Sequence, residues 1–405
     1  MANKIIVCQT GSRHRYLIPR VLENQGLLYR LYTDSTRYSI IGRLGNILLK
    51  LGFKHPILKR LNERDPSLKD MRILKTTDSY FIKDCFYSIF WSRDGGHRIR
   101  LLYHGFENTC IRWGIGDADC IYSMYFENMK FLRFAKSKGM KIVVDIYETP
   151  MTYKYLLEEL KLPEYAPFSK MEKEYQNKQR VRMEHVEEML ALADYYTVPS
   201  KFVMKSMVEF KNYDPNKVIF LPYASSLASK EYNYKPIIHR IIYVGNDPMR
   251  KGLLYCAKAA TELKKKYKDL DFRIIGSGNE ILRDQETFKN LNFIGVLDHS
   301  HLLQEYSSAE AYVFPTLFEG FAGTIIEAAS CGCPIITTEN AGTDVEEFPA
   351  IYIPSRDVEA IINAVERIFE NSDLRDDLSR RVFDYAKQLS PSAYEKRMYN
   401  CFKSI

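Results

Sequence analysis

Short runs of β-branched and aromatic residues recur along the whole chain, and segments with a helical period lie between several of them. In the first half these runs begin at Ile5, Leu27, Cys120, Lys141, Tyr195 and Val218. In the second half they begin at Arg240, Phe272, Asn292, Ala311, Pro334 and Ala350. The clearest helical pattern runs from Gln179 to Asp194, where apolar residues fall on one face at spacings of three and four. The alternation of strand, helix and strand predicts parallel sheets covered by helices.

The length of 405 residues and one break in the pattern predict two domains of similar size. From Ala224 to Pro236 the chain is polar and loses its periodicity, which is typical of a linker. Strand and helix patterns resume near Ile238. We therefore expect one Rossmann-like domain over residues 1–225 and a second over residues 226–388.

The composition is typical of a globular protein rather than a disordered one. Apolar residues make up 46% and charged residues 27% of the chain. No run of about eighteen apolar residues occurs, and an apolar strand follows the first few residues instead of a secretory signal. The eight cysteines lack the paired CxxC spacing of zinc or redox sites. We expect a cytoplasmic protein with free, mostly buried thiols and no metal site.

Positive charge is concentrated in the first quarter of the chain, where residues 1–100 hold 19 Lys and Arg but 8 Asp and Glu. Within this part, residues 35–62 contain no acid, several Lys and Arg, and many large apolar residues. Two interpretations remain open for this segment. It forms a crossover helix packed on the first sheet, or a surface that meets anionic lipid or a lipid-linked acceptor. The second interpretation places the protein peripherally on the inner face of the membrane.

The segment from Phe314 to Asp344 combines a strand, a turn that contains glycine, a helix and a second strand. Thr324 and Glu327 have the spacing of a capping box, so we expect the helix to begin near Thr324 and to end at Gly332. The N–H groups of its first turn would then point out of the turn at the carboxyl end of the strand. Anions, and phosphates in particular, bind at such places.

This segment resembles the signature of glycosyltransferase family 4, whose members have the GT-B fold. The matching residues are Glu319, Gly320, Phe321, Glu327, Ala328, Gly332 and Pro334. The resemblance implies that Glu319 and the turn from Gly320 to Gly323 hold the donor sugar. It also implies that Glu327 binds the ribose hydroxyls, with Thr324 beside it on the nucleotide side. Ala322 stands where the family usually has glycine, so the loop near the sugar departs from the family pattern.

A second match, from Tyr243 to Gly252, resembles the strand, glycine turn and Lys-Gly segment of the same family. The resemblance implies that Gly245 approaches the nucleotide, and that Lys251 and Arg250 neutralise the charge that develops on the departing diphosphate. Adjacent cations are unfavourable at a helix amino terminus unless an anion is present, which favours a functional role for both. Asn246 stands where many family members carry arginine, and Arg250 can supply the charge that Asn246 lacks.

Three further residues are weaker candidates. The resemblance places the nucleotide base near the backbone of Leu297. Gly11 follows the first strand, where such folds let the backbone approach phosphate or sugar. Tyr147 stands where many family members have a histidine near the transferred sugar. For Tyr147, a contact with acceptor or sugar and a half-buried position at the end of a strand both remain open.

The resemblance implies an α/β protein with two doubly wound parallel sheets that face a cleft, and a last helix, residues 389–405, that packs back on the first domain. It implies transfer of a sugar from a nucleoside-diphosphate sugar to a hydroxyl of a glycan or lipid-linked acceptor, with retention at the anomeric carbon. Such transfer serves polysaccharide or glycolipid synthesis. Catalysis would be electrostatic and positional, without a metal or other cofactor. Asp117 and Asp119 spell the D-x-D of metal-dependent transferases, but that motif belongs to a different fold.

Two other functions remain open. A non-hydrolysing nucleotide-sugar epimerase shares the fold, but it should lack the pair of Glu319 and Glu327. A non-catalytic subunit that binds nucleotide sugar or glycan in a polysaccharide-assembly complex is suggested by the departures at Asn246, Ala322 and Tyr147. Nucleic acid is not expected as a partner, because the basic segment lacks a pattern of stacking aromatic residues. The sugar, the base and the acceptor depend on the shape of the pocket.

Overall fold

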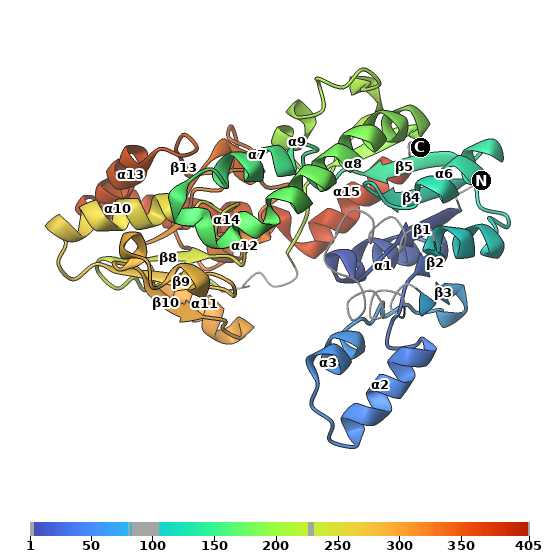
Figure 1. Cartoon of the computed structure of the whole chain (residues 1–405), viewed down its shortest axis with the longest axis horizontal. Helices are drawn as coiled ribbons and strands as arrows, with labels where there is room; N and C mark the ends of the chain where they lie inside the picture. Colours follow the sequence, from blue (N-terminus) through green and yellow to red (C-terminus); the bar gives the residue numbers. More distant parts are fainter. Residues whose placement is uncertain (1–3, 80–81, 83–104, 226–230, 404–405) are drawn as a thin grey trace.

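The computed structural model describes residues 4–79, 82, 105–225 and 231–403. Within these residues the chain forms a seven-stranded and a six-stranded sheet, which lie side by side along the long axis of the molecule (Figure 1). All strand pairings in both sheets are parallel. The predicted α/β architecture of two Rossmann-like halves is confirmed. The linker includes residues 226–230, which lie outside the described residues, so the domain boundaries at 225 and 388 stay a prediction.

The first sheet has the strand order β3-β2-β1-β4-β5-β6-β7. Its strands are β1 (Ile5–Gln9), β2 (Leu28–Thr33), β3 (Leu74–Thr76), β4 (Cys120–Met124), β5 (Lys141–Asp145), β6 (Tyr195–Val198) and β7 (Val218–Phe220). The strand order reverses at β1, and ligands of such sheets bind outside the carboxyl ends of the strands at the reversal. The sequence pattern does not predict the edge strand β3, because three half-buried residues carry too little apolar signal.

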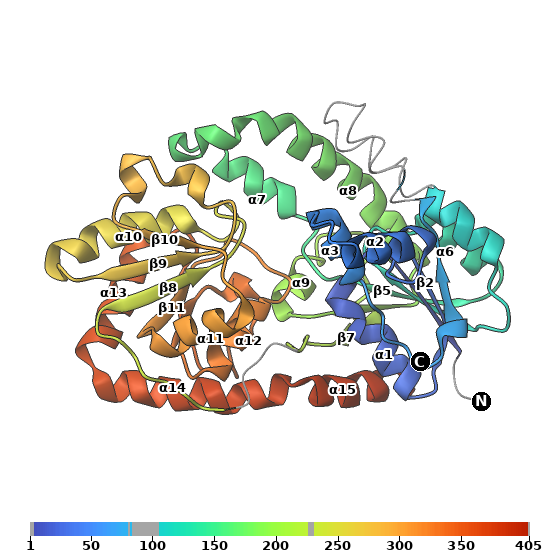
Figure 2. The same cartoon turned by 90° about the horizontal axis from the view of Figure 1, so that it is seen from below.

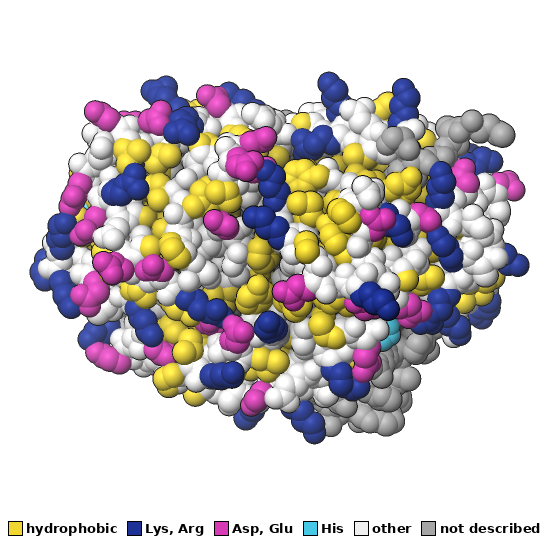
Figure 3. Space-filling model, turned by 90° about the horizontal axis from the view of Figure 1, so that it is seen from above, with side chains coloured by type: hydrophobic (Ala, Val, Ile, Leu, Met, Phe, Trp, Pro, Cys, Tyr) yellow, Lys and Arg dark blue, Asp and Glu magenta, His cyan; other side chains and the backbone are white. Residues whose placement is uncertain are grey.

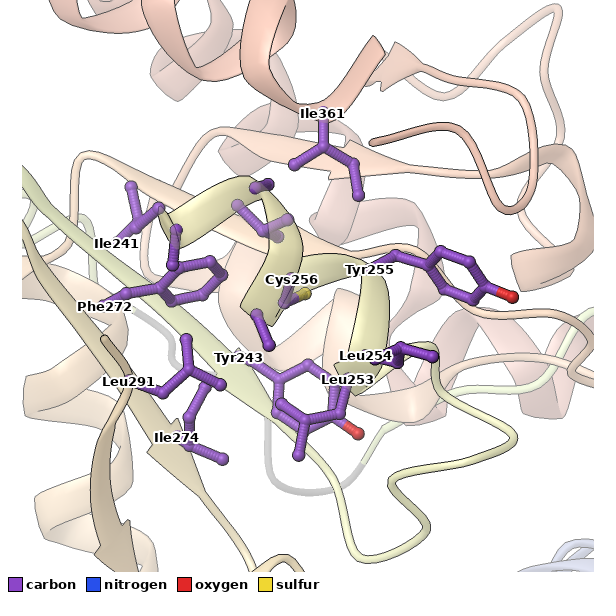
Figure 4. Packing of buried hydrophobic residues seen from close by; sticks show 14 of the residues in the cluster. Ile241, Tyr243, Leu253, Leu254, Tyr255, Cys256, Phe272, Ile274, Leu291 and Ile361 are labelled. Carbon is purple, nitrogen blue, oxygen red and sulfur yellow. The ribbon is translucent and has the colours of Figure 1, made fainter. Parts of the chain in front are cut away.

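The second sheet has the strand order β10-β9-β8-β11-β12-β13. Its strands are β8 (Arg240–Val244), β9 (Asp271–Ile275), β10 (Asn292–Gly295), β11 (Ala311–Phe314), β12 (Ile335–Thr337) and β13 (Ile351–Tyr352). Each coincides with a predicted run. One face packs on α10 (Leu253–Lys266), where Leu253 and Cys256 lie over Tyr243 and Phe272 (Figure 4). Each large apolar side chain buried here contributes about 1.5–3 kcal/mol.

The first half contains the helices α1 (Leu17–Asn24), α2 (Ile40–Lys50), α3 (Pro56–Asn62), α6 (Met129–Ser137), α7 (Thr152–Glu159), α8 (Glu172–Leu192) and α9 (Lys201–Lys205), and residues 105–113 are also helical. The remaining ones are α11 (His299–Ser308), α12 (Gly323–Ser330), α13 (Val358–Glu370), α14 (Ser372–Ala386) and α15 (Pro391–Lys403). The helix predicted near residues 179–194 is confirmed as part of α8. None of the described helices is long and apolar enough to cross a membrane.

Helix α15 returns from the second half of the molecule to the first. It continues the line of α14 and ends beside α1 (Figure 2). Its buried side chains Tyr394, Met398 and Phe402 pack in the same core cluster as residues of β1 and β4. The side-chain amide of Gln25 donates to the carbonyl of Glu395 at 3.0 Å. The expectation of a last helix that packs on the first domain is confirmed.

A second connection between the two halves lies on the other side of the molecule. Helix α7 and the 3-10 segment Pro163–Met171 lie in sequence between β5 and β6 of the first sheet, yet their buried residues Leu156 and Tyr165 belong to the core around α10. The hydroxyl of Tyr165 donates to the carbonyl of Pro248 at 3.2 Å. The two sheets are therefore joined at both edges of the space between them.

Helices α2 and α3 form a hairpin that projects away from the body of the molecule, at the lower side of Figure 1. Most of its large apolar side chains are exposed; Ile40 is 76% and Leu51 is 70% exposed. The interpretation of residues 35–62 as one crossover helix packed on the first sheet is therefore wrong. The connection between β2 and β3 passes through two helices that turn their apolar residues outward.

Candidate functional site

A cavity of about 720 Å³ lies between the two halves of the molecule, at the carboxyl ends of the strands. The first half contributes Arg13, His14, Tyr147, Glu148, Arg182 and Tyr223 to its wall. The second half contributes Asp247, Arg250, Phe318, Glu319, Gly320, Phe321 and Gly323. Much of the predicted site therefore lines one space. Its charges and aromatic rings suit a polar ligand that also presents flat or apolar surface.

Glu319 lies where two cations converge. Its Oε1 is 2.5 Å from Nη1 of Arg250 and 3.7 Å from Nζ of Lys251. Arg250 also pairs with Asp247 at 3.2 Å. Burial opposes the charge of Arg250, but Glu319 and Asp247 outweigh it and hold the pKa of the guanidinium above its ordinary value. The amide of Leu317 donates to the carbonyl of Arg250 at 2.9 Å, which fixes the two loops against each other.

Lys251 lies partly buried against the glycine turn that follows β8. A Cβ at Gly245 would lie 2.3 Å from Cδ of Lys251, so the glycine provides the space for the lysine chain. The ammonium stands 5.0 Å from the centre of the Phe314 ring. Burial lowers the pKa of Lys251, and the attraction of Glu319 offsets this only in part. An incoming phosphate would therefore stabilise this ammonium more than it would stabilise an exposed one.

Asn246, where the family resemblance expects arginine, joins the turns after β8 and β9. Its Oδ1 accepts a hydrogen bond from the amide of Ser277 at 3.0 Å. Beside it, the side-chain amide of Asn279 donates to the carbonyl of Gly245 at 2.7 Å. Asn246 therefore holds the backbone of the loop in place. The positive charge at this end of the cleft is supplied by Arg250 and Lys251.

The turn after Glu319 touches the first half of the molecule at Tyr147. A Cβ on Gly320 would lie 1.6 Å from the carbonyl oxygen of Tyr147, so a residue with a side chain cannot take this place without displacing backbone. On its other side, a Cβ on Gly342 would lie 2.4 Å from the carbonyl oxygen of Gly320. The rings of Phe321 and Tyr223 meet edge to face with centroids 6.3 Å apart. The predicted donor-sugar turn thus lies within the interface between the halves.

Helix α12 begins without the predicted capping box. Its N-cap is Ala322, which makes no side-chain cap hydrogen bond, and Gly323 is the first helical residue. The hydroxyl of Thr324 pairs with that of Tyr312 at 2.9 Å. The capping box between Thr324 and Glu327 is therefore wrong, because Thr324 already lies inside the first turn. A helix amino terminus that lacks a side-chain cap and reaches a cavity suits an anionic ligand.

Glu327 lies on α12 and is 8% exposed. The hydroxyl of Ser225 donates to its Oε1 at 3.5 Å, which brings the end of the first half against this carboxylate. Burial raises the pKa of Glu327, while Arg15 of the turn after β1 acts in the opposite direction. Glu327 is therefore an enclosed carboxylate and not a solvated cap. The helix ends at Ser330, and Gly332 follows with a φ of 78°, close to the predicted end.

The first half contributes a residue that the sequence analysis does not single out, His14. Its Nε2 lies 3.9 Å from Oδ2 of the buried Asp145, and its ring centre lies 4.1 Å from that of Tyr223. Oδ1 of Asp145 accepts hydrogen bonds from Tyr223 at 2.7 Å and Thr197 at 3.1 Å. Burial raises the pKa of Asp145 to about 6. Burial, and next to it Arg13, lowers the pKa of His14 to about 4.

The backbone that carries His14 into the cavity is strained. His14, Arg15 and Tyr16 have φ values of 46°, 51° and 58°, and each such residue costs about 1–2 kcal/mol. Gly11 precedes them with a φ of 69°, and its amide donates to Oδ1 of Asp34 at 2.8 Å. In the sequence only Gly11 signals this turn. The contact of His14 with Asp145, more than a hundred residues away, produces no local pattern in the sequence.

Two weaker candidates have contrasting positions. Tyr147 lines the cavity, where the guanidinium of Arg13 lies 4.7 Å from its ring centre and donates to its hydroxyl at 3.3 Å. Leu297 is half-buried and packs beside the core of the second half. The cavity wall does not include Leu297, Lys251 or Glu327.

Asp117 and Asp119 lie just before β4, at the amino end of the first sheet, whereas the cavity lies at the carboxyl ends. The carboxylate of Asp119 accepts a hydrogen bond from the amide of Lys4 at 2.8 Å. Among the residues that the structure describes, no three His, Cys, Asp or Glu side chains gather in a way that could hold a metal ion. The D-x-D triplet is thus remote from the candidate site.

Comparison with known protein families gives a match in the second half of the chain. A family model described as "Glycosyl transferases group 1" matches residues 238–371. The 2-deoxystreptamine N-acetyl-D-glucosaminyltransferase of Niallia circulans is 28% identical over 166 residues, which are 39% of this chain and 42% of that protein. The chain thus spans about two fifths of the length of that curated relative. The span that the family model matches includes both segments that carry the family resemblance.

Solved structures match across both halves. Sucrose-phosphate synthase from Thermosynechococcus elongatus has a TM-score of 0.67 and 15% identity, and the match covers 99% of this chain and 98% of that one. HepE from Anabaena, solved in complex with UDP-glucose, has a TM-score of 0.61 and 11% identity, with coverage of 99% and 100%. At these identities the likeness concerns the fold. The chain has the GT-B fold that the sequence resemblance implied.

Proposed function

We propose that this protein is a metal-independent, retaining glycosyltransferase of family 4, which moves a sugar from a nucleoside-diphosphate sugar to a hydroxyl of a glycan or lipid-linked acceptor. The observation that carries the proposal is the convergence of Arg250 and Lys251 on Glu319 beside a cavity between the two halves. Partly buried cations of this kind suit a diphosphate, and a carboxylate beside them suits sugar hydroxyls. The match of residues 238–371 to a glycosyltransferase model supports it.

The proposed donor lies along the second half of the cleft. Its diphosphate faces Lys251, Arg250 and the amino end of α12, where positive charge is concentrated. Its sugar faces Glu319 and the turn that follows. Its ribose faces Glu327, whose burial favours a hydrogen-bonded neutral partner such as a hydroxyl pair. The complex of HepE with UDP-glucose supports a nucleotide sugar as the ligand class.

The proposed reaction depends on charge and position. As the bond between sugar and diphosphate breaks, negative charge grows on the leaving phosphate beside Arg250 and Lys251. Both side chains are held by Glu319 before the reaction, so little reorganisation is needed. The anomeric carbon develops oxocarbenium character, and the acceptor hydroxyl adds on the face from which the diphosphate leaves. The leaving phosphate oxygen accepts the hydroxyl proton, and the configuration is retained.

A second candidate function is a non-catalytic subunit that binds nucleotide sugar or glycan. It is favoured by the side chains that replace family residues, because Asn246 accepts a hydrogen bond from the amide of Ser277 in the next turn, and Tyr147 contacts Arg13. The two functions differ in one property. A transferase consumes its donor in the presence of an acceptor, whereas a binding subunit is stabilised by the donor and leaves it intact.

The place of action that we propose is the cytoplasm, with peripheral contact to the inner face of the membrane. Nucleotide sugars are cytoplasmic solutes, and lipid-linked acceptors lie in the membrane. Synthesis of a cell-surface polysaccharide or glycolipid would bring the two together at this surface.

The proposal is tested by thermal unfolding with a panel of nucleotide sugars. A true donor at a hundred times its dissociation constant stabilises the fold by about 2.7 kcal/mol, which is a clear shift of the melting temperature. The stabilising donor is then incubated with glycan acceptors, and NMR of the product gives its anomeric configuration. The failure of every nucleotide sugar to stabilise the protein would refute the proposal. An inverted product would refute only retention.

A further inference from the structure

The hairpin of α2 and α3 packs inward through its smallest residues. A Cβ on Gly42 would lie 1.8 Å from the carbonyl oxygen of Thr36, so α2 touches the backbone that leads into it. A Cβ on Gly45 would lie 3.5 Å from the side chain of Leu58, on α3. Gly42 and Gly45 are the buried residues of α2. Because its glycines face the protein, the large side chains of α2 face outward.

The outward face of α2 is an apolar stripe. Its members follow one another at helical spacings, so they share one side of the helix. They are Ile40, Leu44, Ile47, Leu48 and Leu51, exposed by 76%, 56%, 54%, 39% and 70%. Phe53 and Ile57 continue the stripe toward α3 and are 59% and 42% exposed. A contiguous apolar surface of this kind marks a binding surface on a folded protein.

Within the hairpin segment itself every charged side chain is basic, while at its base Asp65 pairs with Arg37 at 2.8 Å. Residues 35–62 contain Arg37, Arg43, Lys50, Lys54, Lys59 and Arg60, and no Asp or Glu. On the opposite side of the molecule, in the view from above, acidic and basic side chains alternate over the surface (Figure 3). A helix with a large apolar face and flanking cations matches the interface of an anionic bilayer. There the apolar residues contact the acyl chains of the lipids, and the cations pair with the lipid phosphates.

We propose that the α2–α3 hairpin docks on an anionic lipid bilayer, with its apolar stripe in the headgroup region and its cations against the lipid phosphates. The 11 residues of α2 are too few to cross the bilayer, so the helix lies in the plane of the surface. This inference deepens the proposed function, because it supplies the surface on which a lipid-linked acceptor would be met.

The base of the hairpin is fixed to the cleft. Arg64, just after α3, pairs with Asp34 at 2.8 Å and donates to the carbonyl of Ser35 at 3.2 Å. The other oxygen of Asp34 accepts the amide of Gly11, which opens the turn that carries His14 into the cavity. A hairpin docked on a membrane would therefore hold the acceptor side of the cleft at a defined place near the lipid surface.

The test is co-sedimentation of the full chain with vesicles of phosphatidylcholine, with and without phosphatidylglycerol. We expect capture by the mixed vesicles and not by phosphatidylcholine alone, with weakening as salt is raised. One variant changes Lys50, Lys54, Lys59 and Arg60 to Gln. A second changes Ile47, Leu51 and Phe53 to Ser. Each should lower vesicle affinity by more than about tenfold.

The matched control changes four exposed lysines on the other side of the molecule to Gln, namely Lys154, Lys161, Lys170 and Lys173.

The outcomes separate this inference from the proposed function. Donor binding, measured by the melting temperature, should be the same in all of these variants, because none of the changed residues lines the cleft. Failure of the wild type to bind mixed vesicles at low salt would overturn the docking inference and leave the transferase proposal intact. An equal loss of vesicle affinity in the control variant would also overturn the docking inference, since the loss would then reflect the net charge of the protein. Self-association through the stripe without vesicle binding would overturn it in favour of a protein interface.

Discussion

Gly320 and Gly323 lie three residues apart in one turn and have opposite surroundings. A Cβ on Gly320 would overlap the carbonyl oxygen of Tyr147, whereas a Cβ on Gly323 meets nothing within 4 Å. We expect Gly320→Ala to separate the two halves and to lower transfer by more than about a hundredfold, because about 1 Å of misplacement has that effect on an aligned site. Gly323→Ala should melt at the same or a higher temperature, since alanine favours a helix. Melting curves and transfer rates of both variants check this. Equal behaviour would contradict the close contact of Gly320 with Tyr147.

Lys251 is partly buried, and its proposed contribution is electrostatic. Lys251→Met keeps the apolar chain beside Gly245 and removes the charge. We expect turnover to fall by about a hundredfold or more, with little loss of folding stability, because burial already disfavours the charged form. Steady-state rates and urea unfolding measure the two effects. The exposed Lys268→Met is the control and should change neither. Full turnover in Lys251→Met would remove the lysine from the mechanism.

Asp145 gives the folded protein a defined pH dependence. Its pKa is raised from 3.8 to about 6, so its contribution to stability is fully present below about pH 4 and is lost as the pH rises through 6. Asp145→Asn removes this dependence and keeps an acceptor for the hydroxyls of Tyr223 and Thr197. The free energy of unfolding of the variant minus that of wild type should therefore increase by about 1 kcal/mol when the pH is raised from 5 to 8.

The pKa of His14 is lowered from 6.5 to about 4. Its contribution to folding stability is therefore lost as the pH falls through this range, which is opposite in direction to the contribution of Asp145. The comparison at Asp145 is therefore made in a His14→Gln background, where the imidazole cannot titrate. Urea unfolding at several pH values gives the difference. A difference that does not change with pH would show that burial does not disfavour the charged form of Asp145.

At the scale of elements, α15 connects the end of the chain to the first core. Met398 is fully buried beside residues of β1 and β4, while its neighbour Tyr399 is 42% exposed. We expect Met398→Ala to lower the free energy of unfolding by about 2–5 kcal/mol, and Tyr399→Ala to change it by less than about 1 kcal/mol. Urea unfolding followed by far-UV circular dichroism measures both. Equal small losses would mean that α15 is not packed on the first half.

At the scale of the whole molecule, the cleft is bordered by contacts that join the two halves on each side. Because Arg250 and Lys251 would supply the positive charge at the leaving diphosphate, we expect transfer to continue in excess EDTA. Transfer rates with and without the chelator check this expectation. Loss of transfer in EDTA that manganese restores would contradict it, and would require a metal-ligand set that includes the substrate.

Much of the fold is predictable because strands and helices are specified by local patterns. Runs of β-branched residues mark every described strand except β3, whose three residues are half-buried at the edge of the first sheet. The predicted helix start near Thr324 is confirmed to within one residue, but the predicted cap is wrong, because the hydroxyl of Thr324 pairs with Tyr312 on the preceding strand. Local spacing predicts a cap only when no tertiary partner competes for the side chain.

By itself, the sequence determined two parallel sheets, because local periodicity carries that information, and its resemblance to glycosyltransferase family 4 brought Glu319, Lys251 and Arg250 forward as one site. Only the tertiary structure decided that Gly320 meets Tyr147, that His14 faces Asp145, and that the apolar residues of α2 point outward. Each of these depends on which surfaces meet after folding. Segments distant in sequence share no periodicity, so such contacts are set by packing and not by local pattern.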